Sequence, residues 1–262
     1  MLKSKSAKAI VILATLFALF GAELGPRVRV WAGERYSSGR PPQFFSWTIA
    51  DRAAGYGHVV GIAHNAGDDP GTTALALANG AGYIEIDVVY LNEALYAAHG
   101  HPQGTLRELD AWNYSAGAKG IELDIKDGSP AALQMLVNFL NDHWDGRTPL
   151  LLASKTPSVL EYMADRVPGA FRLLSIDTPA ALDAFQSGHA SGARLDGVTV
   201  RDTLLTKDSV EAFKKDGLLV LAWTVDDPAR LDQLLDLGID GVATNNLAIT
   251  KRLSGGVFTW SR

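Results

Sequence analysis

The sequence predicts one α/β domain built as a (β/α)8 TIM barrel, preceded by an N-terminal signal or anchor segment. Eight short apolar runs follow one another between residues 58 and 244, and segments with helical spacing separate most of them. Parallel strands are joined by crossover helices, and eight such strands close a barrel. An open doubly wound sheet is the alternative, but no glycine-rich phosphate fingerprint follows the first run.

The expected strands are residues 58–64, 83–90, 121–126, 150–153, 171–176, 197–200, 218–225 and 241–244. Four helix starts place a capping side chain directly before a proline, at Ser129, Thr156, Thr178 and Asp227. Asp208 with Glu211 predicts a capping box. Three glycines are expected to end helices in the left-handed conformation, Gly188, Gly217 and Gly238.

Residues 1–32 are interpreted as a signal peptide or signal anchor. Three lysines precede an uncharged apolar run, residues 9–22, which is shorter than the roughly 20 residues of a membrane span. Val30-Trp31-Ala32 is the expected cleavage site. We therefore expect an exported protein, secreted or periplasmic, or one anchored to a membrane by this segment; a buried hydrophobic helix is the third interpretation.

The remaining chain is divided into a linker or lead-in (33–56), a barrel domain (57–255) and a C-terminal tail (256–262). The leader holds five basic residues and one acidic residue, so its removal changes the net charge from −5 to −9. Such a charge disfavours nucleic-acid binding. The sequence has no cysteine, which excludes thiol nucleophiles, thiolate metal sites and disulfides. The protein is expected to be a monomer.

Two expected strands carry acids at alternate positions. Glu85 and Asp87 share one face of their strand, while isoleucines and valines occupy the other face. In residues 120–126, Glu122, Asp124 and Lys126 share a face in the same way. In a barrel these faces point inward near the carboxyl ends of the strands, where active sites lie. An exposed edge with solvated acids is the alternative.

Oxygen-only ligands of this kind suit one hard divalent cation, Mg²⁺ or Ca²⁺. Lys126 either offsets the acids or binds a substrate phosphate. His64 ends the first expected strand and His99 follows an apolar run, residues 94–98, so both are expected at the barrel mouth. Imidazole serves as acid or base near neutral pH. His101 is an alternative to His99 or a plain loop residue.

These motifs, in this order, resemble the glycerophosphodiester phosphodiesterase superfamily of phospholipase C-like phosphodiesterases. The series comprises His64, then Glu85-Ile-Asp87 after Gly-Ala-Gly, then His99, and then Asp124-Ile-Lys126. Residues 222–228 and 237–245 resemble the last two strands of that superfamily. The resemblance implies a metal-dependent phosphoric diester hydrolase acting on glycerophosphodiesters.

The resemblance also implies roles for individual residues. His64 and His99 would be the acid/base pair, and Glu85, Asp87 and Asp124 the metal ligands. Substrate contacts are then expected from the residues Lys126, Trp223, Asn65 and His101.

The sequence departs from the glycerophosphodiester enzymes at two positions. Asn65 and Gly100 stand where those enzymes usually have Arg and Asp. His99-Gly-His-Pro and Asp124-Ile-Lys126 are more similar to the sphingomyelinase D branch, without its cysteines. Cleavage of phospholipid head groups is therefore one alternative function, and a non-catalytic exported binding protein on the same barrel is another.

Overall fold

The computed structural model describes residues 59–99, 108–188 and 194–256. The chain divides into two compact units, and all described residues belong to the second, Gln43–His101 with Arg107–Arg262. The expected leader, the linker, His101 and nearly all of the expected tail lie outside the described residues. The other unit, residues 1–42 and 102–106, lies outside them entirely.

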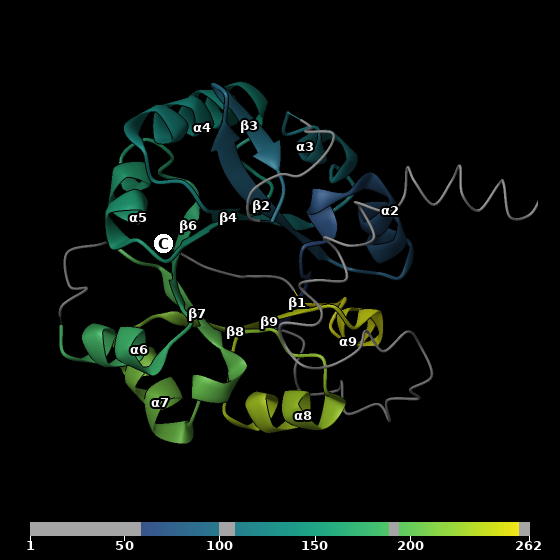
Figure 1. The fold of residues 1–262 in the computed structure, drawn as a ribbon. Coiled ribbons are helices and arrows are strands. Elements are labelled where there is room, and N and C mark those ends of the chain that lie inside the picture. The colour runs from purple at the N-terminus through teal and green to yellow at the C-terminus, as the bar shows by residue number, and fades with distance from the viewer. Residues whose placement is uncertain (1–58, 100–107, 189–193, 257–262) are drawn as a thin grey trace, which may run out of the picture. The chain divides into compact units, whose positions relative to one another are not determined.

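Eight parallel strands form a closed barrel, as the sequence predicts (Figure 1). They are β1 (Val60–Ala63), β2 (Tyr83–Leu91), β4 (Gly120–Ile125), β5 (Leu150–Ser154), β6 (Phe171–Ile176), β7 (Gly197–Arg201), β8 (Leu219–Trp223) and β9 (Gly241–Thr244). The barrel closes because β1 pairs with both β9 and β2. A further strand, β3 (Ala94–Ala97), folds back antiparallel on β2.

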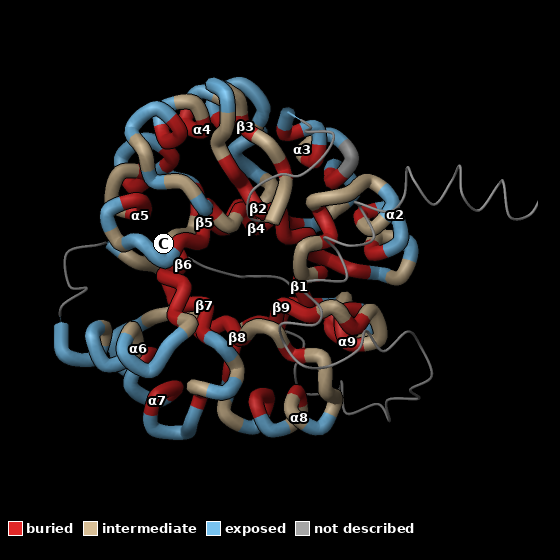
Figure 2. Tube along the Cα trace, in the orientation of Figure 1, coloured by how far each residue is buried: buried red, intermediate tan, exposed pale blue. Residues whose placement is uncertain are grey.

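Helices surround the barrel, and most of them turn a buried side toward the strands and an exposed side outward (Figure 2). The helices are α2 (Pro70–Ala78), α3 (Ala111–Tyr114), α4 (Pro130–His143), α5 (Pro157–Ala164), α6 (Pro179–Gln186), α7 (Lys207–Lys215), α8 (Pro228–Asp236) and α9 (Leu247–Arg252). Among these helices of the described chain, the one with no buried residue is α6. Two short 3₁₀ turns, η2 (Ala66–Asp68) and η3 (Asp202–Leu204), follow β1 and β7.

The four predicted helix starts before a proline are confirmed. The side chains of Ser129, Thr178 and Asp227 accept from helix amides, whereas the Thr156 side chain makes no capping hydrogen bond. The predicted capping box at Asp208 is wrong. The helix α7 begins two residues earlier, where the Thr206 hydroxyl accepts from the amide of Ser209 and the Ser209 hydroxyl accepts from the amide of Thr206. The three glycines expected in the left-handed conformation have φ values of 74–81°.

The strand register shows which side chains fill the barrel. Tyr83 pairs with Ile62, Glu85 with Glu122, and Asp87 with Asp124. Side chains that share a register position face the same side, because side chains alternate along each strand. The apolar part of the interior consists of Val60, Ile62, Tyr83, Leu151, Ala153, Leu173, Leu221 and Ala243.

The floor of this interior depends on one aromatic side chain. Tyr83 is fully buried, and its ring occupies the space beside Gly120, where a Cβ atom would lie 2.1 Å from Tyr83 Cε1. The interior below the mouth is therefore a packed core, and ligands have access only at the carboxyl ends of the strands.

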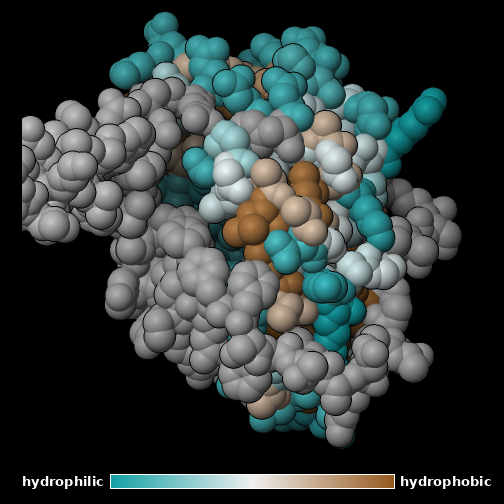
Figure 3. All heavy atoms as spheres, turned by 90° about the vertical axis from the view of Figure 1, so that its right-hand side faces the viewer, coloured by the Kyte–Doolittle hydropathy of each residue, from teal (hydrophilic) through white to brown (hydrophobic). Residues whose placement is uncertain are grey.

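The face of the barrel that presents α2 shows apolar side chains among polar ones (Figure 3). Leu75, at 43% exposure, is the exposed large apolar residue of the described part of the chain. Within those same ranges, no helix has the length and apolar character needed to cross a membrane.

Candidate active site

Every barrel strand delivers a polar or aromatic side chain to the mouth. The register, continued by alternation past the strand ends, places the following residues at the inward positions nearest the carboxyl ends: His64, Asp87, Asp124, Lys126, Lys155, Asp177, Arg201, Trp223 and Asn245. We call this set the mouth ring. Of its members, Lys155, Asp177, Arg201 and Asn245 were not predicted as site residues. Their signal was a polar or charged residue that continues the inward alternation at the end of its strand.

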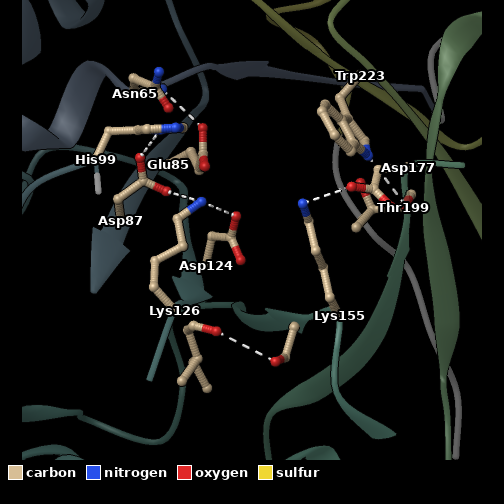
Figure 4. A network of polar contacts seen from close by, with 12 residues as sticks. Asn65, Glu85, Asp87, His99, Asp124, Lys126, Lys155, Asp177, Thr199 and Trp223 are labelled. Carbon is tan, nitrogen blue, oxygen red and sulfur yellow. Dashed lines mark hydrogen bonds and ion pairs between the residues drawn. The ribbon is translucent and has the colours of Figure 1, made fainter. Parts of the chain in front are cut away.

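Three carboxylates meet on one side of the mouth (Figure 4). One oxygen each from Glu85, Asp87 and Asp124 lies within 4.8 Å of the others. Glu85 and Asp87 are buried, with 4% and 0% exposure. The Lys126 ammonium lies 2.7 Å from Asp87 Oδ1 and also forms an ion pair with Asp124. The structure therefore brings the three predicted ligands and Lys126 together.

Burial and mutual repulsion set the ionisation of these acids. Burial, and then the neighbouring Asp87 charge, raises the pKa of Glu85 well above its usual range. Burial also raises the pKa of Asp124. Burial alone would raise the pKa of Asp87 too, but the His99 hydrogen bond and Lys126 hold it below its usual value. The acids thus favour additional positive charge.

The β2–β3 hairpin delivers His99 to the cluster. The amide of Ala98 donates to the Asp87 carbonyl over 3.0 Å, which extends the hairpin by one residue. His99 Nδ1 then lies 2.5 Å from Asp87 Oδ2. The prediction that His99 lies at the mouth is correct, and the reason is the antiparallel return of β3.

His64 is held from the other side by a chain of hydrogen bonds. Asp226 accepts from the amide of Asn245 at 2.7 Å and from its Nδ2 at 3.1 Å. The Asn245 Oδ1 is thereby turned toward His64 Nδ1, 3.2 Å away. An amide oxygen only accepts, so Nδ1 of neutral His64 carries the proton and Nε2 has a free lone pair.

The free nitrogen of His64 faces the acid cluster. Nε2 lies 3.8 Å from Glu85 Oε2. Burial lowers the pKa of His64 below its usual value, against the opposing effects of Asp87 and Asn245. A neutral His64 with an unprotonated Nε2 is a proton acceptor.

Two residues near His64 support Glu85 and Asp87 through the backbone. The amide of Asn65, which is left-handed with φ 53°, donates to Glu85 Oε2 over 2.7 Å. The carboxyl of Asp68 accepts from the amide of Asp87 over 2.9 Å. Burial, with the charges of Asp87 and Glu85, raises the pKa of Asp68. Asp68 was not predicted, because it lies in a turn and not on a strand.

Trp223 lies across the mouth from the carboxylates (Figure 4). Its indole Nε1 donates to the carbonyl of Thr199 over 3.2 Å, which fixes the ring plane. The Arg201 guanidinium lies 5.4 Å from the ring centroid. Trp223 is half-buried and ends β8 at the mouth.

The donor set fits a divalent cation. The three carboxylates supply oxygen ligands within reach of one ion, and they are too buried to be solvated individually. Lys126 offsets part of their charge, and a divalent cation would offset the remainder. No sulfur or imidazole ligand belongs to the three, so the set favours Mg²⁺ or Ca²⁺ over zinc.

The barrel and its mouth define a class of site, an acidic cluster flanked by two histidines at the carboxyl ends of the strands of an α/β barrel. Residues 127–249 match the model of the glycerophosphoryl diester phosphodiesterase family. Over these residues, a little under half of the sequence, the chain is similar to that family, in line with the resemblance that the motifs carry. The matched segment begins directly after Lys126, so the predicted histidines and ligands precede it.

Solved structures with the same fold include three bacterial enzymes. A phosphodiesterase from Oleispira antarctica, in complex with the product sn-glycerol-3-phosphate, is 18% identical with a TM-score of 0.61, covering 74% of this chain and 96% of that one. Glycerophosphodiester phosphodiesterases from Thermotoga maritima and Parabacteroides distasonis are each 17% identical. The Thermotoga maritima structure has a TM-score of 0.58 and covers 75% of this chain and 98% of its own. The Parabacteroides distasonis structure has a TM-score of 0.61 and covers 75% of this chain and 97% of its own. A search of curated proteins finds no match.

Proposed function

We propose that this chain hydrolyses glycerophosphodiesters with one divalent cation, Mg²⁺ or Ca²⁺, held by Glu85, Asp87 and Asp124. One observation carries the proposal: two histidines approach the same acid cluster from opposite sides. His64 Nε2 lies 3.8 Å from Glu85, and His99 Nδ1 lies 2.5 Å from Asp87. Cleavage of a phosphodiester needs one group to accept a proton and another to donate one, and this pair supplies both.

The two histidines differ in the protonation that their surroundings favour. Asn245 holds a proton on Nδ1 of His64, and burial lowers its pKa, so His64 acts as the base through Nε2. The ion pair with Asp87 favours the imidazolium form of His99, which acts as the acid toward the leaving oxygen. The proton accepted by His64 comes from water or from a hydroxyl group of the substrate.

Lys126 provides the permanent positive charge of the site. Burial would lower its pKa, but Asp87 and Asp124 raise it above its usual value. Lys126 therefore stays charged and binds a phosphoryl oxygen. When bound, the divalent cation polarises a phosphoryl oxygen and neutralises the charge that develops on it. Trp223 lines the opposite wall, and Asn65 acts mainly by holding Glu85 through its backbone amide.

The test is turnover by the purified full-length chain on glycerophosphocholine, lysophosphatidylcholine and sphingomyelin, with Mg²⁺, with Ca²⁺ and with chelator. We expect cation-dependent release of glycerol phosphate from the first substrate. His64→Ala and His99→Ala should each lose nearly all of it, and His143→Ala, at an exposed position on α4, should keep it. Full rates in both mouth variants would refute the assignment. Preference for an intact lipid would indicate head-group cleavage, and no turnover would favour a binding protein.

The N-terminal segment supports a second proposal, that the chain is exported or anchored to a membrane. Basic residues followed by an apolar run are the supporting feature. Sequencing the N-terminus of the mature protein from cell fractions tests it. Recovery at residue 33 in the periplasm or medium would support cleavage, and an intact N-terminus in the cytosol would refute export. Sedimentation of the same material tests the expected monomer.

A further inference from the structure

The half of the mouth ring contributed by β5 to β8 has no role in the chemistry above. Lys155 and Asp177 follow directly after β5 and β6, and Arg201 and Trp223 end β7 and β8. Arg201 and Trp223 are register partners on neighbouring strands. Figure 4 shows Lys155, Asp177 and Trp223 across the opening from Lys126 and the acids.

Contacts among these residues fix their arrangement. The Lys155 ammonium lies 2.6 Å from Asp177 Oδ2. The Lys155 hydrogen bond lowers the pKa of Asp177, and the charge of Arg201 contributes to the same shift, so Arg201 also lies within electrostatic reach of Asp177. Asp177 is thus paired with Lys155 and lies within electrostatic reach of Arg201, so two cations stand against one carboxylate in this half of the ring.

Both cations are accessible from the mouth. The Lys155 side chain is 59% exposed, and Arg201 is also exposed. Their backbones belong to or directly follow barrel strands, so the charges are presented from a rigid frame. Surplus positive charge at one wall of a pocket, in a chain of net charge −5, is a specific attraction for an anionic group.

The aromatic wall disfavours a cationic head group. A tryptophan face attracts quaternary ammonium groups. Here the Arg201 guanidinium already lies over the Trp223 ring, 5.4 Å from its centroid. A choline group on this face of the ring would have to displace the guanidinium or lie beside it, and either arrangement is unfavourable.

We propose that Lys155 and Arg201 form a head-group subsite that selects glycerophosphodiesters whose head group bears a second anion, such as a phosphate monoester or a carboxylate. The subsite rests on the proposed hydrolysis, because the scissile phosphate must lie at the acid cluster for its head group to reach the opposite wall. Asp177 orients Lys155, and the Trp223 ring supports Arg201.

The experiment compares kcat/KM for glycerophosphoinositol 4-phosphate, glycerophosphoglycerol and glycerophosphocholine, which carry an anionic, a neutral and a cationic head group. We expect that order of preference, with the anionic substrate favoured over choline by roughly 10- to 100-fold, the range for one charge-assisted hydrogen bond. Lys155→Gln and Arg201→Gln should each reduce this ratio about tenfold. Lys207→Gln, an exposed lysine on α7, should leave it unchanged.

Equal rates for the three substrates, or a preference that persists in both variants, would overturn the subsite while leaving the hydrolytic function intact. Turnover of none of them would overturn the hydrolytic function instead. Titration calorimetry on the His64→Ala chain then decides the subsite independently. The subsite is supported if glycerophosphoinositol 4-phosphate binds more tightly than glycerophosphocholine and if Arg201→Gln removes this difference. Equal binding of the two ligands refutes the subsite.

Discussion

The orientation of the Asn245 side-chain amide decides which nitrogen of His64 is free. We expect the substitution Asp226→Asn to reverse that orientation. In the protein, the Asp226 carboxylate accepts from Asn245 Nδ2 at 3.1 Å. In the variant, the amide oxygen of residue 226 still accepts from the Asn245 backbone amide and the Thr244 hydroxyl, as Asp226 Oδ1 does. The amide nitrogen therefore takes the place of Asp226 Oδ2. Two NH₂ groups then face each other, and Asn245 turns over to relieve the clash.

The turned Asn245 presents a donor to His64 Nδ1. That nitrogen must then accept, and the proton moves to Nε2, which faces Glu85. A hydrogen bond contributes about 1 kcal/mol, and an unpaired buried polar group costs about 1–3 kcal/mol. We take a free-energy difference of about 2–3 kcal/mol in favour of the tautomer protonated at Nε2. The fraction of His64 with an unprotonated Nε2 then falls by roughly 30- to 150-fold. The loss should fall on kcat, with KM little changed.

Three measurements test this reasoning. Steady-state kinetics on glycerophosphocholine give kcat and KM, and ¹⁵N chemical shifts of His64 report its tautomer directly. The double variant Asp226→Asn with Asn245→Asp restores an acceptor beside Nδ1 and should recover most of the lost kcat. A kcat within threefold of the wild type in Asp226→Asn, or a double variant no better than the single one, would refute the tautomer argument.

Three further outcomes follow from the geometry. Asp124→Asn removes one anionic ligand and should weaken Mg²⁺ binding by roughly tenfold or more in titration calorimetry; unchanged affinity would contradict the ligand set. Gly120→Ala forces a Cβ against the buried Tyr83 ring, which should cost about 1–3 kcal/mol and lower Tm by several degrees, whereas Gly117→Ala, with 3.6 Å of clearance, should not. Burial, followed by neighbouring acids, raises the pKa of Glu122, so the folded chain keeps a proton that the unfolded chain loses above about pH 4.3. The contribution of Glu122 to stability therefore falls as pH rises above this value. In urea unfolding with chelator present, the Glu122→Gln variant should gain stability relative to the wild type as pH rises. A difference that stays constant with pH would show that Glu122 ionises normally.

Much of the fold was determined by local patterns in the sequence. Apolar runs at regular intervals predict the strands, and a capping residue before proline predicts helix starts such as Ser129-Pro130 and Asp227-Pro228. These signals are reliable because they depend on a few neighbouring residues. The α7 capping box was misplaced for the same reason: Thr206 and Asp208 are both capping residues, and only packing of Val210 and Phe213 decides the start.

The site was predicted where its residues lie on strands. Alternation placed Glu85 with Asp87, and Glu122 with Asp124 and Lys126, on inward faces before any tertiary contact was known. His99 was also placed correctly at the mouth. The tertiary structure added that the hairpin brings it onto Asp87, because the pairing of β3 with β2 is antiparallel.

Contacts between residues far apart in the sequence were decided only by the tertiary structure. Asn245, held by Asp226, contacts His64 across 181 residues of sequence, and Lys155 and Arg201 reach the same side of the mouth only through the order of β5, β6 and β7. Local pattern shows that a residue is polar and faces inward, but a hydrogen-bond partner depends on strand register and barrel closure. The residues of the mouth were therefore largely visible in the sequence, whereas the proposed proton acceptor, proton donor and head-group wall depend on the closed barrel.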